Sequence, residues 1–336
     1  MWRISCFQES VVGFCHEHHA LKFMRHGVQW VKGVPGMLTG IKIAFVGGDA
    51  RIIEVIRRMS ELDAVTRLFG FDRIDLQLPD MQKLELSPQA LAEVDVVVLP
   101  VAGMNEDGTI DAKFSSATLM FDEDHFAAIT KAAPVFTGIA RPRLMSLAKR
   151  HGLNLIKLME LDEVAILNSI PTAEGAIAMA MENTEITIHG STCAVLGLGR
   201  SGMTLARVLA ALGAQVLLGA RKEGDLARAK EMGLTPFSLT EIDEAIDHVD
   251  IIFNTIPAPI LTSEVLTHVQ RSAVVIDIAS APGGTDFRYA ERRGIKALLA
   301  PSLPGMVAPK TAGRIIAQSL ERLIREQVWF PGGIVK

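Results

Sequence analysis

Short apolar runs alternate with amphipathic segments along most of this chain. In its first half, runs of strand length are separated by stretches whose apolar residues recur at helical spacing. These runs lie at residues 41–46, 65–70, 94–100, 133–138 and 153–158. Strands alternating with helices predict a parallel sheet with helices on both faces. The segment Val101–Thr118, which follows the third run, is expected to be a long loop bordering an active-site cleft.

The same alternation repeats in the second half of the chain. Apolar runs lie at residues 191–196, 215–218, 249–257, 273–280 and 296–300, and an amphipathic helix follows at about 308–327. We therefore expect an α/β fold of two Rossmann-like, doubly wound parallel-sheet domains with a cleft between them.

Polar residues and a proline at Asn168–Thr172 predict the crossing between these domains, with Pro171 in the first turn of a helix. We place an N-terminal substrate domain at 37–170 and a dinucleotide-binding domain at 171–307. The C-terminal helix at about 308–327 is expected to pack back on the first domain.

Residues 1–36 lack this alternation. They contain Cys6, Cys15 and several histidines at spacings that match no ordinary zinc site, so we expect no metal there. A signal peptide is also not expected, because no apolar stretch with a small-residue cleavage site follows. We interpret residues 1–36 as a mis-assigned or non-native extension and Met37 as the natural start.

Composition narrows the class of partner. The net charge of −4 and the absence of a long Lys/Arg run argue against nucleic acid. The most apolar run, Val94–Ala102, is too short to span a membrane and contains Asp95. Three cysteines, Cys6, Cys15 and Cys193, fit a reducing compartment. These properties favour a cytoplasmic enzyme that acts on a small molecule.

A glycine-rich turn carries the clearest chemical signal. The apolar run at 191–196 leads directly into Gly197-Leu198-Gly199-Arg200-Ser201-Gly202, and apolar residues at helical spacing follow. This is G-x-G-x-x-G between a strand and a helix, the context that dinucleotide binding requires. Gly197 suits the tight turn, Gly199 the approach of a pyrophosphate and Gly202 close helix packing. Arg200 and Ser201 contribute to the helix N-terminus, which attracts phosphate.

The next strand predicts which dinucleotide binds. NAD-binding domains usually place an acidic residue about 20 residues past the first motif glycine, where it binds the ribose 2′-hydroxyl. Here that region reads Leu217-Leu218-Gly219, and it is followed by Arg221 and Lys222, which we expect to be cofactor-binding residues. An arginine without a nearby carboxylate suits a 2′-phosphate, so NADP is favoured over NAD. A solvated Arg-Lys turn beside Glu223 is the alternative interpretation.

Further candidates follow other strands. The strand ends at Thr255-Ile256-Pro257 and Ala279-Ser280 are expected beside the nicotinamide and its ribose. In the first domain, Asp49 and Arg51 follow the first strand. They are either a helix cap with its surface partner or part of a substrate site.

Several longer motifs are more specific than the glycine turn. From Met37 onward the chain resembles the family of dipicolinate synthase A subunits. The motifs that carry the resemblance are MLTGIKIAFVGGDAR (37–51), NSIPTAEGAI (168–177), IHGSTCAVLGLGRSGMTLAR (188–207), FNTIPAPIL (253–261), SAPGGTDF (280–287) and LPGMVAPKTAG (303–313).

The resemblance implies an NADP-dependent oxidoreductase subunit that forms dipicolinate (pyridine-2,6-dicarboxylate) from a dihydrodipicolinate-type precursor. It also implies that the partner is a flavoprotein-like B subunit. The location that it implies is the mother-cell cytoplasm of a sporulating bacterium. We further expect a homo-oligomer.

A dicarboxylate substrate requires cations or helix N-termini, for which Arg51, Lys310 and the helix start at Pro171–Thr172 are candidates. Thr172 and Glu174 are expected near the nicotinamide side. Asp49 and Glu174 are candidate bases, but no residue is marked as the general acid or base, and no histidine lies in a catalytic motif.

Two alternatives remain open. A 2-hydroxyacid or shikimate-type dehydrogenase would share the two-domain plan, but the 280–286 loop lacks the arginine that hydroxyacid dehydrogenases use, and no histidine follows His268. A non-catalytic NADP-binding regulatory subunit is the second alternative, because no acid–base pair stands out.

Overall fold

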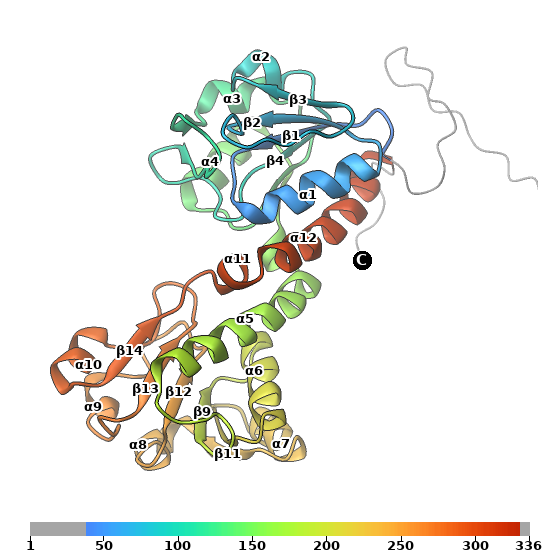
Figure 1. Cartoon of the computed structure of the whole chain (residues 1–336). Coiled ribbons are helices and arrows are strands. Elements are labelled where there is room, and N and C mark those ends of the chain that lie inside the picture. The colour runs from blue at the N-terminus through green and yellow to red at the C-terminus, as the bar shows by residue number, and fades with distance from the viewer. Residues whose placement is uncertain (1–37, 330–336) are drawn as a thin grey trace, which may run out of the picture. The chain divides into compact units, whose positions relative to one another are not determined.

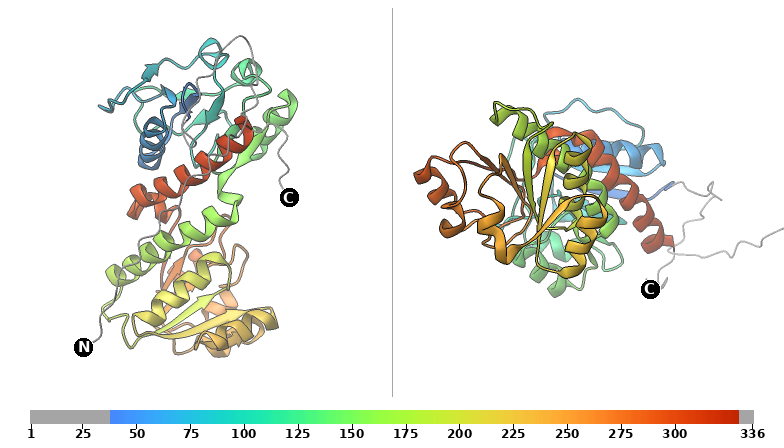
Figure 2. Two further views of the ribbon diagram at one scale, coloured as in Figure 1. Left: turned by 90° about the vertical axis from the view of Figure 1, so that its right-hand side faces the viewer. Right: turned by 90° about the horizontal axis from the view of Figure 1, so that it is seen from below.

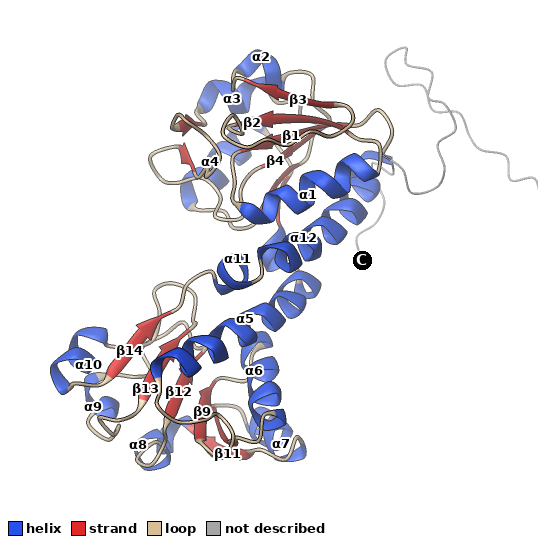
Figure 3. Ribbon diagram, viewed as in Figure 1, coloured by secondary structure: helices blue, strands red, loops and turns tan. Residues whose placement is uncertain are grey.

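The computed structural model describes residues 38–329 of the chain (Figure 1). It contains two six-stranded sheets, in which every strand pair is parallel. Helices flank both sheets (Figure 3). The predicted fold class, two Rossmann-like parallel-sheet domains, is therefore confirmed. The interpretation of residues 1–36 as an extension without a metal site lies outside the described residues.

The first sheet has the strand order β3-β2-β1-β4-β7-β8. Successive side chains of a strand point to opposite faces, so Ile43 and Phe45 of β1 enter one buried cluster and Ala44 and Val46 enter another. The strands are β1 (Lys42–Val46), β2 (Val65–Phe69), β3 (Met81–Leu84), β4 (Val96–Val98), β7 (Val135–Thr137) and β8 (Leu155–Lys157). The helices among them are α1 (Ala50–Glu61), α2 (Pro88–Leu91), α3 (Glu123–Ala128), α4 (Pro142–His151) and the short 3-10 helix η1 (Leu158–Glu160).

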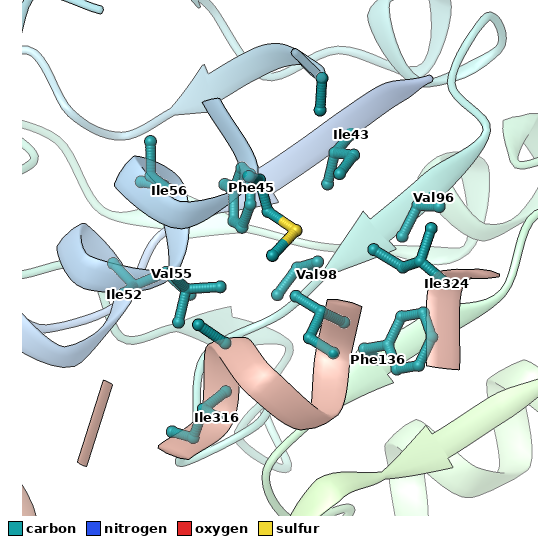
Figure 4. Close-up of a cluster of buried hydrophobic side chains, with 14 of the residues drawn as sticks. Ile43, Phe45, Ile52, Val55, Ile56, Val96, Val98, Phe136, Ile316 and Ile324 are labelled. Carbon is teal, nitrogen blue, oxygen red and sulfur yellow. The ribbon is translucent and has the colours of Figure 1, made fainter. Parts of the chain in front are cut away.

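The last long helix of the chain completes the core of this first domain. Helix α12 (Pro309–Ile324), which continues as the π-helical turn η3 (Arg325–Trp329), runs alongside α1 (Figures 1 and 2). Its residues Ile316 and Ile324 lie in the same buried cluster as Ile43 and Phe45 (Figure 4). Leu320 belongs to the same cluster. The hydrophobic core of the first domain is thus built from residues near both ends of the described chain.

The second sheet repeats the order of the first, as β11-β10-β9-β12-β13-β14. In each sheet the order reverses beside the first strand, and ligands of such sheets bind at that point, outside the carboxyl ends of the strands. The strands are β9 (Thr192–Leu196), β10 (Gln215–Ala220), β11 (Thr235–Ser238), β12 (Ile251–Asn254), β13 (Val274–Asp277) and β14 (Lys296–Leu299). The helices are α6 (Arg200–Ala211), α7 (Glu223–Glu231), η2 (Leu239–Glu241), α8 (Ile242–Ala245), α9 (Ser263–Leu266), α10 (Phe287–Arg293) and α11 (Leu303–Val307).

Helix α5 (Asp162–Asn183) overturns the predicted helix start at Pro171–Thr172. The helix begins at Asp162 and contains Pro171 in its interior, so the boundary placed between residues 170 and 171 falls inside a helix. Proline lacks an N–H and leaves a helical carbonyl unpaired. Two hydroxyls bond carbonyls near it: Ser169 Oγ donates to Ile166 O (2.6 Å), and Thr172 Oγ1 donates to Asn168 O (2.8 Å). Pro171 itself is buried, and packing overrides its local preference.

Helix α5 is also notable for its apolar composition. Among the described residues it is the one helix whose length and hydropathy would suffice to cross a membrane. Half of that apolar stretch is buried inside the protein, where α5 contacts α6, α11 and α12. A core helix passes the same test, so this composition is only a weak indication of a membrane span.

The segment Val101–Thr118 is more ordered than the long loop predicted for it. It contains β5 (Thr109–Ile110), which pairs antiparallel with β6 (Leu119–Met120). Gly48 N donates to Asp111 O (2.7 Å), and Lys113 N donates to Gly48 O (3.0 Å). These two bonds fix the hairpin against the turn that follows β1.

Candidate functional site

The glycine turn of the second domain joins the carboxyl end of β9 to α6. Gly197 has a φ of +98°, which favours glycine, and a Cβ there would lie 2.6 Å from Thr255 Oγ1. A Cβ on Gly202 would overlap the carbonyl oxygen of Gly197, so α6 packs directly on the turn. Gly199 differs from both, because among the described residues no atom outside Gly199 and its two chain neighbours lies within 4 Å of the position of its Cβ. The turn is therefore closely packed at two glycines and open at the third, as a loop that admits a pyrophosphate requires.

The first turn of α6 offers free hydrogen-bond donors beside Gly199. Gly199 is the N-cap residue; it provides no side-chain cap, and no acidic residue lies in the first turn. Helix geometry leaves the backbone N–H groups of Arg200, Ser201 and Gly202 without helical acceptors. The Arg200 side chain pairs with Asp162 of α5 (2.9 Å) at the surface. This arrangement fits an anionic phosphate, and direct contact with a cofactor stays a prediction.

Arg221 and Lys222 lie at the same edge of the sheet as this turn. They follow β10, which pairs with β9, and both side chains are exposed. Lys222 is the N-cap residue of α7. In the described part of the chain neither residue forms an ion pair, which leaves Arg221 available for an anion. Its exposure is also what a solvated turn would show.

Two of the candidates that follow β12 and β13, Ile256 and Ala279, are held by residues that sequence reasoning missed. Thr255 Oγ1 donates to Leu196 O (2.8 Å), and Ile256 N donates to Asn254 Oδ1 (3.0 Å). Ala279 N donates to Asp277 Oδ1 (3.0 Å). Asn254 and Asp277 are fully buried at the last positions of their strands. Each of these apolar strands ends in a polar residue, and this pattern in the sequence could have identified Asn254 and Asp277.

Asp49 and Arg51 of the first domain bind each other. Asp49 is the N-cap residue of α1, and its Oδ1 accepts from Arg51 N (3.0 Å). The guanidinium Nη2 of Arg51 donates to Asp49 Oδ2 (2.5 Å), and a Cβ on Gly305 would lie 3.0 Å from its Cζ. Burial raises the pKa of Asp49, but the hydrogen bonds and charge of Arg51 outweigh burial and hold that pKa below its ordinary value. This geometry matches the cap-and-partner interpretation.

Asp49→Asn is expected to flatten the acid side of the stability profile. Because the folded-state pKa is depressed, the carboxylate stabilises the fold above its unfolded-state pKa of about 3.9, and this contribution is lost as pH falls through the folded-state value. The variant should lose about 1–3 kcal/mol at neutral pH. Urea unfolding of both proteins should show the difference shrinking as pH falls. A difference that is constant with pH would contradict the assignment.

The motifs at Gly47–Arg51, Asn168–Ile177 and Leu303–Gly313 meet in space. Gly305 of α11 lies against the Arg51 guanidinium, and a Cβ on Gly175 of α5 would lie 3.2 Å from Leu303 and Val307 side-chain atoms. Small residues thus let α11 approach α1 and α5 closely. These three motifs owe part of their composition to packing.

Other substrate candidates are dispersed. Lys310 is exposed and lines a groove of about 450 Å³ between α1 and α12, and Arg51 is not among the residues that line it. Thr172 Oγ1 is engaged with the Asn168 carbonyl, whereas Glu174 is exposed. The helix start proposed as an anion site does not exist, because Pro171 and Thr172 lie inside α5. The groove residues are Glu54, Arg57, Arg58, Glu61, Lys310, Arg314, Ala317 and Gln318.

Two parallel sheets with a glycine turn at the switch point of the second define a protein of the dinucleotide-binding dehydrogenase class. Residues 171–282 match the family model "D-isomer specific 2-hydroxyacid dehydrogenase, NAD binding domain", which supports a nicotinamide dinucleotide cofactor. Residues 42–159 match the family model for the N-terminal domain of the dipicolinate synthase A subunit. Together with a relative from Bacillus subtilis that is 47% identical over 86% of this chain, this match shows that the chain belongs to the family of dipicolinate synthase A subunits, as its motifs predict.

Individual relatives agree with this assignment. The dipicolinate synthase A subunit of Bacillus subtilis is 47% identical over 290 residues, which cover 86% of this chain and 98% of the relative. A crystal structure of the dipicolinate synthase A subunit from Bacillus halodurans has a TM-score of 0.84 and 48% identity, covering 86% of this chain and 99% of that chain. An L-alanine dehydrogenase structure has a TM-score of 0.58 at 14% identity, covering 86% and 90% of the two chains, and shows the fold alone.

Proposed function

We propose that this chain is the NADP-dependent oxidoreductase subunit that forms dipicolinate from a dihydrodipicolinate-type precursor in the mother-cell cytoplasm of a sporulating bacterium. The observation that carries the proposal is an open dinucleotide turn in a chain 47% identical to the A subunit of a dipicolinate synthase. The dehydrogenase-type match of the second domain supports a redox reaction.

The reaction is a two-electron oxidation. A bound oxidised nicotinamide supplies a hydride acceptor. Loss of one hydride and one proton converts a dihydropyridine dicarboxylate into the aromatic pyridine dicarboxylate. In this chain the first-turn N–H groups of α6 would hold the pyrophosphate, and Gly199 leaves room for it. The loops after β12 and β13 would line the nicotinamide side.

NADP specificity would rest on Arg221. Arg221→Ala should raise the Michaelis constant for NADP by about tenfold or more and leave that for NAD nearly unchanged, since a guanidinium binds a phosphate bidentately. Lys230→Ala, in the last turn of α7, is the matched control for loss of one exposed positive charge. Steady-state kinetics with both cofactors makes the comparison, and equal effects on the two cofactors would remove the argument for NADP.

The candidate substrate residues are more widely dispersed than the candidate cofactor residues. Lys310 and Arg51 remain our candidate cations for the dicarboxylate, although Asp49 already neutralises Arg51. Asp49 is a weak candidate for the general base, because its pKa is held low. Glu174, exposed on α5, is the remaining candidate base.

The relatives are named as one subunit of a synthase, which supports a partner. We propose that this partner is the flavoprotein-like B subunit, and that the chain also forms a homo-oligomer. The test assays this chain, the purified B subunit, and their mixture for NADP-dependent formation of dipicolinate by ultraviolet absorbance. The proposal expects product only when this chain is present. If the B subunit alone formed dipicolinate at the full rate, this chain would be a regulatory subunit and the proposal would be wrong.

A further inference from the structure

Among the described residues, Asp277 is a buried carboxylate that forms no ion pair. It closes β13, lies in register beside Asn254 of β12, and both residues have no exposed surface. Its Oδ2 accepts from Thr285 Oγ1 (2.6 Å), Gly284 N (3.0 Å) and Asn254 Nδ2 (3.1 Å). Its Oδ1 accepts from Ala279 N (3.0 Å). No lysine or arginine within residues 38–329 forms an ion pair with it, so neutral donors alone stabilise the charge.

The four hydrogen bonds to the Asp277 carboxylate fix two loops, the one that follows β12 and the one that follows β13. Ala279 and Gly284 donate from the two ends of the loop that follows β13, so the carboxylate closes that loop. Asn254 extends the network to the loop that follows β12, because its Nδ2 also donates to Ile256 O (3.1 Å). A Cβ on Gly284 would lie 2.5 Å from Asn254 Nδ2, so the two loops are fitted to each other at this glycine.

Stability alone is a poor reason for such an arrangement. A buried charge costs free energy that neutral hydrogen bonds only partly offset, and an apolar residue would fill the end of a strand at lower cost. What the carboxylate does provide is a fixed conformation of both loops, since every donor must be in place at once. Loops fixed before a ligand arrives reduce the ordering cost of binding.

The location of these loops indicates the ligand they serve. They follow β12 and β13, on the opposite side of β9 from β10, whose end carries Arg221. In sheets of this order the two halves of a dinucleotide lie on the two sides of the switch point. We propose that Asp277 is a positioning residue for the nicotinamide half of the cofactor, acting through the loop Ala279–Thr285. This inference rests on the proposed cofactor.

Thr285→Val tests the proposal with minimal change of shape, because it removes one donor to the carboxylate. Thr285→Ser keeps that donor and is the matched control. The full chain is titrated with NADPH and with 2′-phospho-ADP-ribose, which lacks only the nicotinamide. We expect Thr285→Val to weaken NADPH binding about tenfold, to leave 2′-phospho-ADP-ribose within about twofold, and Thr285→Ser to bind both like the wild type. Asp277→Asn should show the same selectivity with a larger loss.

Two outcomes would overturn the inference. Equal weakening of both ligands would mean that the carboxylate only supports the fold, and unchanged NADPH binding would mean that the loop does not face the nicotinamide. Wild-type protein that binds neither of these ligands, nor NADH and ADP-ribose, would instead refute the proposed function, and the positioning role with it. A wild type that prefers NADH is tested with NADH and ADP-ribose, and the same selectivity is expected.

Discussion

Gly199→Ala should lose cofactor affinity by roughly 10- to 100-fold while its stability stays close to that of the wild type. Among the described residues, the new methyl group meets no atom within 4 Å outside Gly199 and its two chain neighbours, so the folded chain accommodates it. A pyrophosphate that approaches the α6 N-terminus must pass this open position, and a methyl group there obstructs it.

Gly202→Ala is the contrasting variant, three residues along the same turn. Its methyl group would overlap the carbonyl oxygen of Gly197, so α6 must shift away from the turn. We expect it to lose about 1–3 kcal/mol of unfolding free energy in addition to cofactor affinity.

Urea unfolding and calorimetric titration of NADPH on both variants separate the two effects. The assignment requires an affinity loss without a stability loss at Gly199 and both losses at Gly202. Full affinity in Gly199→Ala would show that no phosphate group approaches the open glycine.

Local patterns account for what the sequence predicted well. A glycine turn acts through its immediate neighbours, so spacing alone distinguished the open Gly199 from Gly202, which packs against Gly197. The two sheets were also predictable, because a buried parallel strand such as Val96–Val98 is apolar throughout. By contrast, the edge strand Met81–Leu84 is largely exposed and carries polar side chains, so no apolar run marked it.

Features that depend on contacts between residues far apart in the chain could not be predicted from the sequence. Pro171 is typical of a first helical turn, and only the packing of α5 against α6 and α11 keeps it in a helix interior. Arg51 resembled a substrate cation because nothing local shows that Gly305 covers its guanidinium. Asp277 accepts hydrogen bonds from Asn254 of the neighbouring strand β12 and from Gly284 in the loop that follows β13. The sequence around Asp277 does not show that Asn254 lies beside it.

Leu320→Ala should destabilise the first domain by about 2–5 kcal/mol, although Leu320 lies far along the chain from that domain's strands. Leu320 is fully buried on α12, in the cluster that contains Ile43 and Phe45 of β1. Truncating its side chain leaves a cavity between the helix and the sheet, which the packed neighbours fill only in part.

Gln318→Ala, on the exposed side of the same helix, is the control and should change stability by less than about 0.5 kcal/mol. Urea unfolding measures both variants, and NADPH titration under folding conditions adds a second readout. Because Leu320 belongs to the first domain's core and the glycine turn to the second sheet, Leu320→Ala should lower the unfolding midpoint and leave cofactor affinity unchanged. Equal midpoints for the two variants would mean that α12 contributes no burial to the first domain. That result would contradict a core built from both ends of the chain.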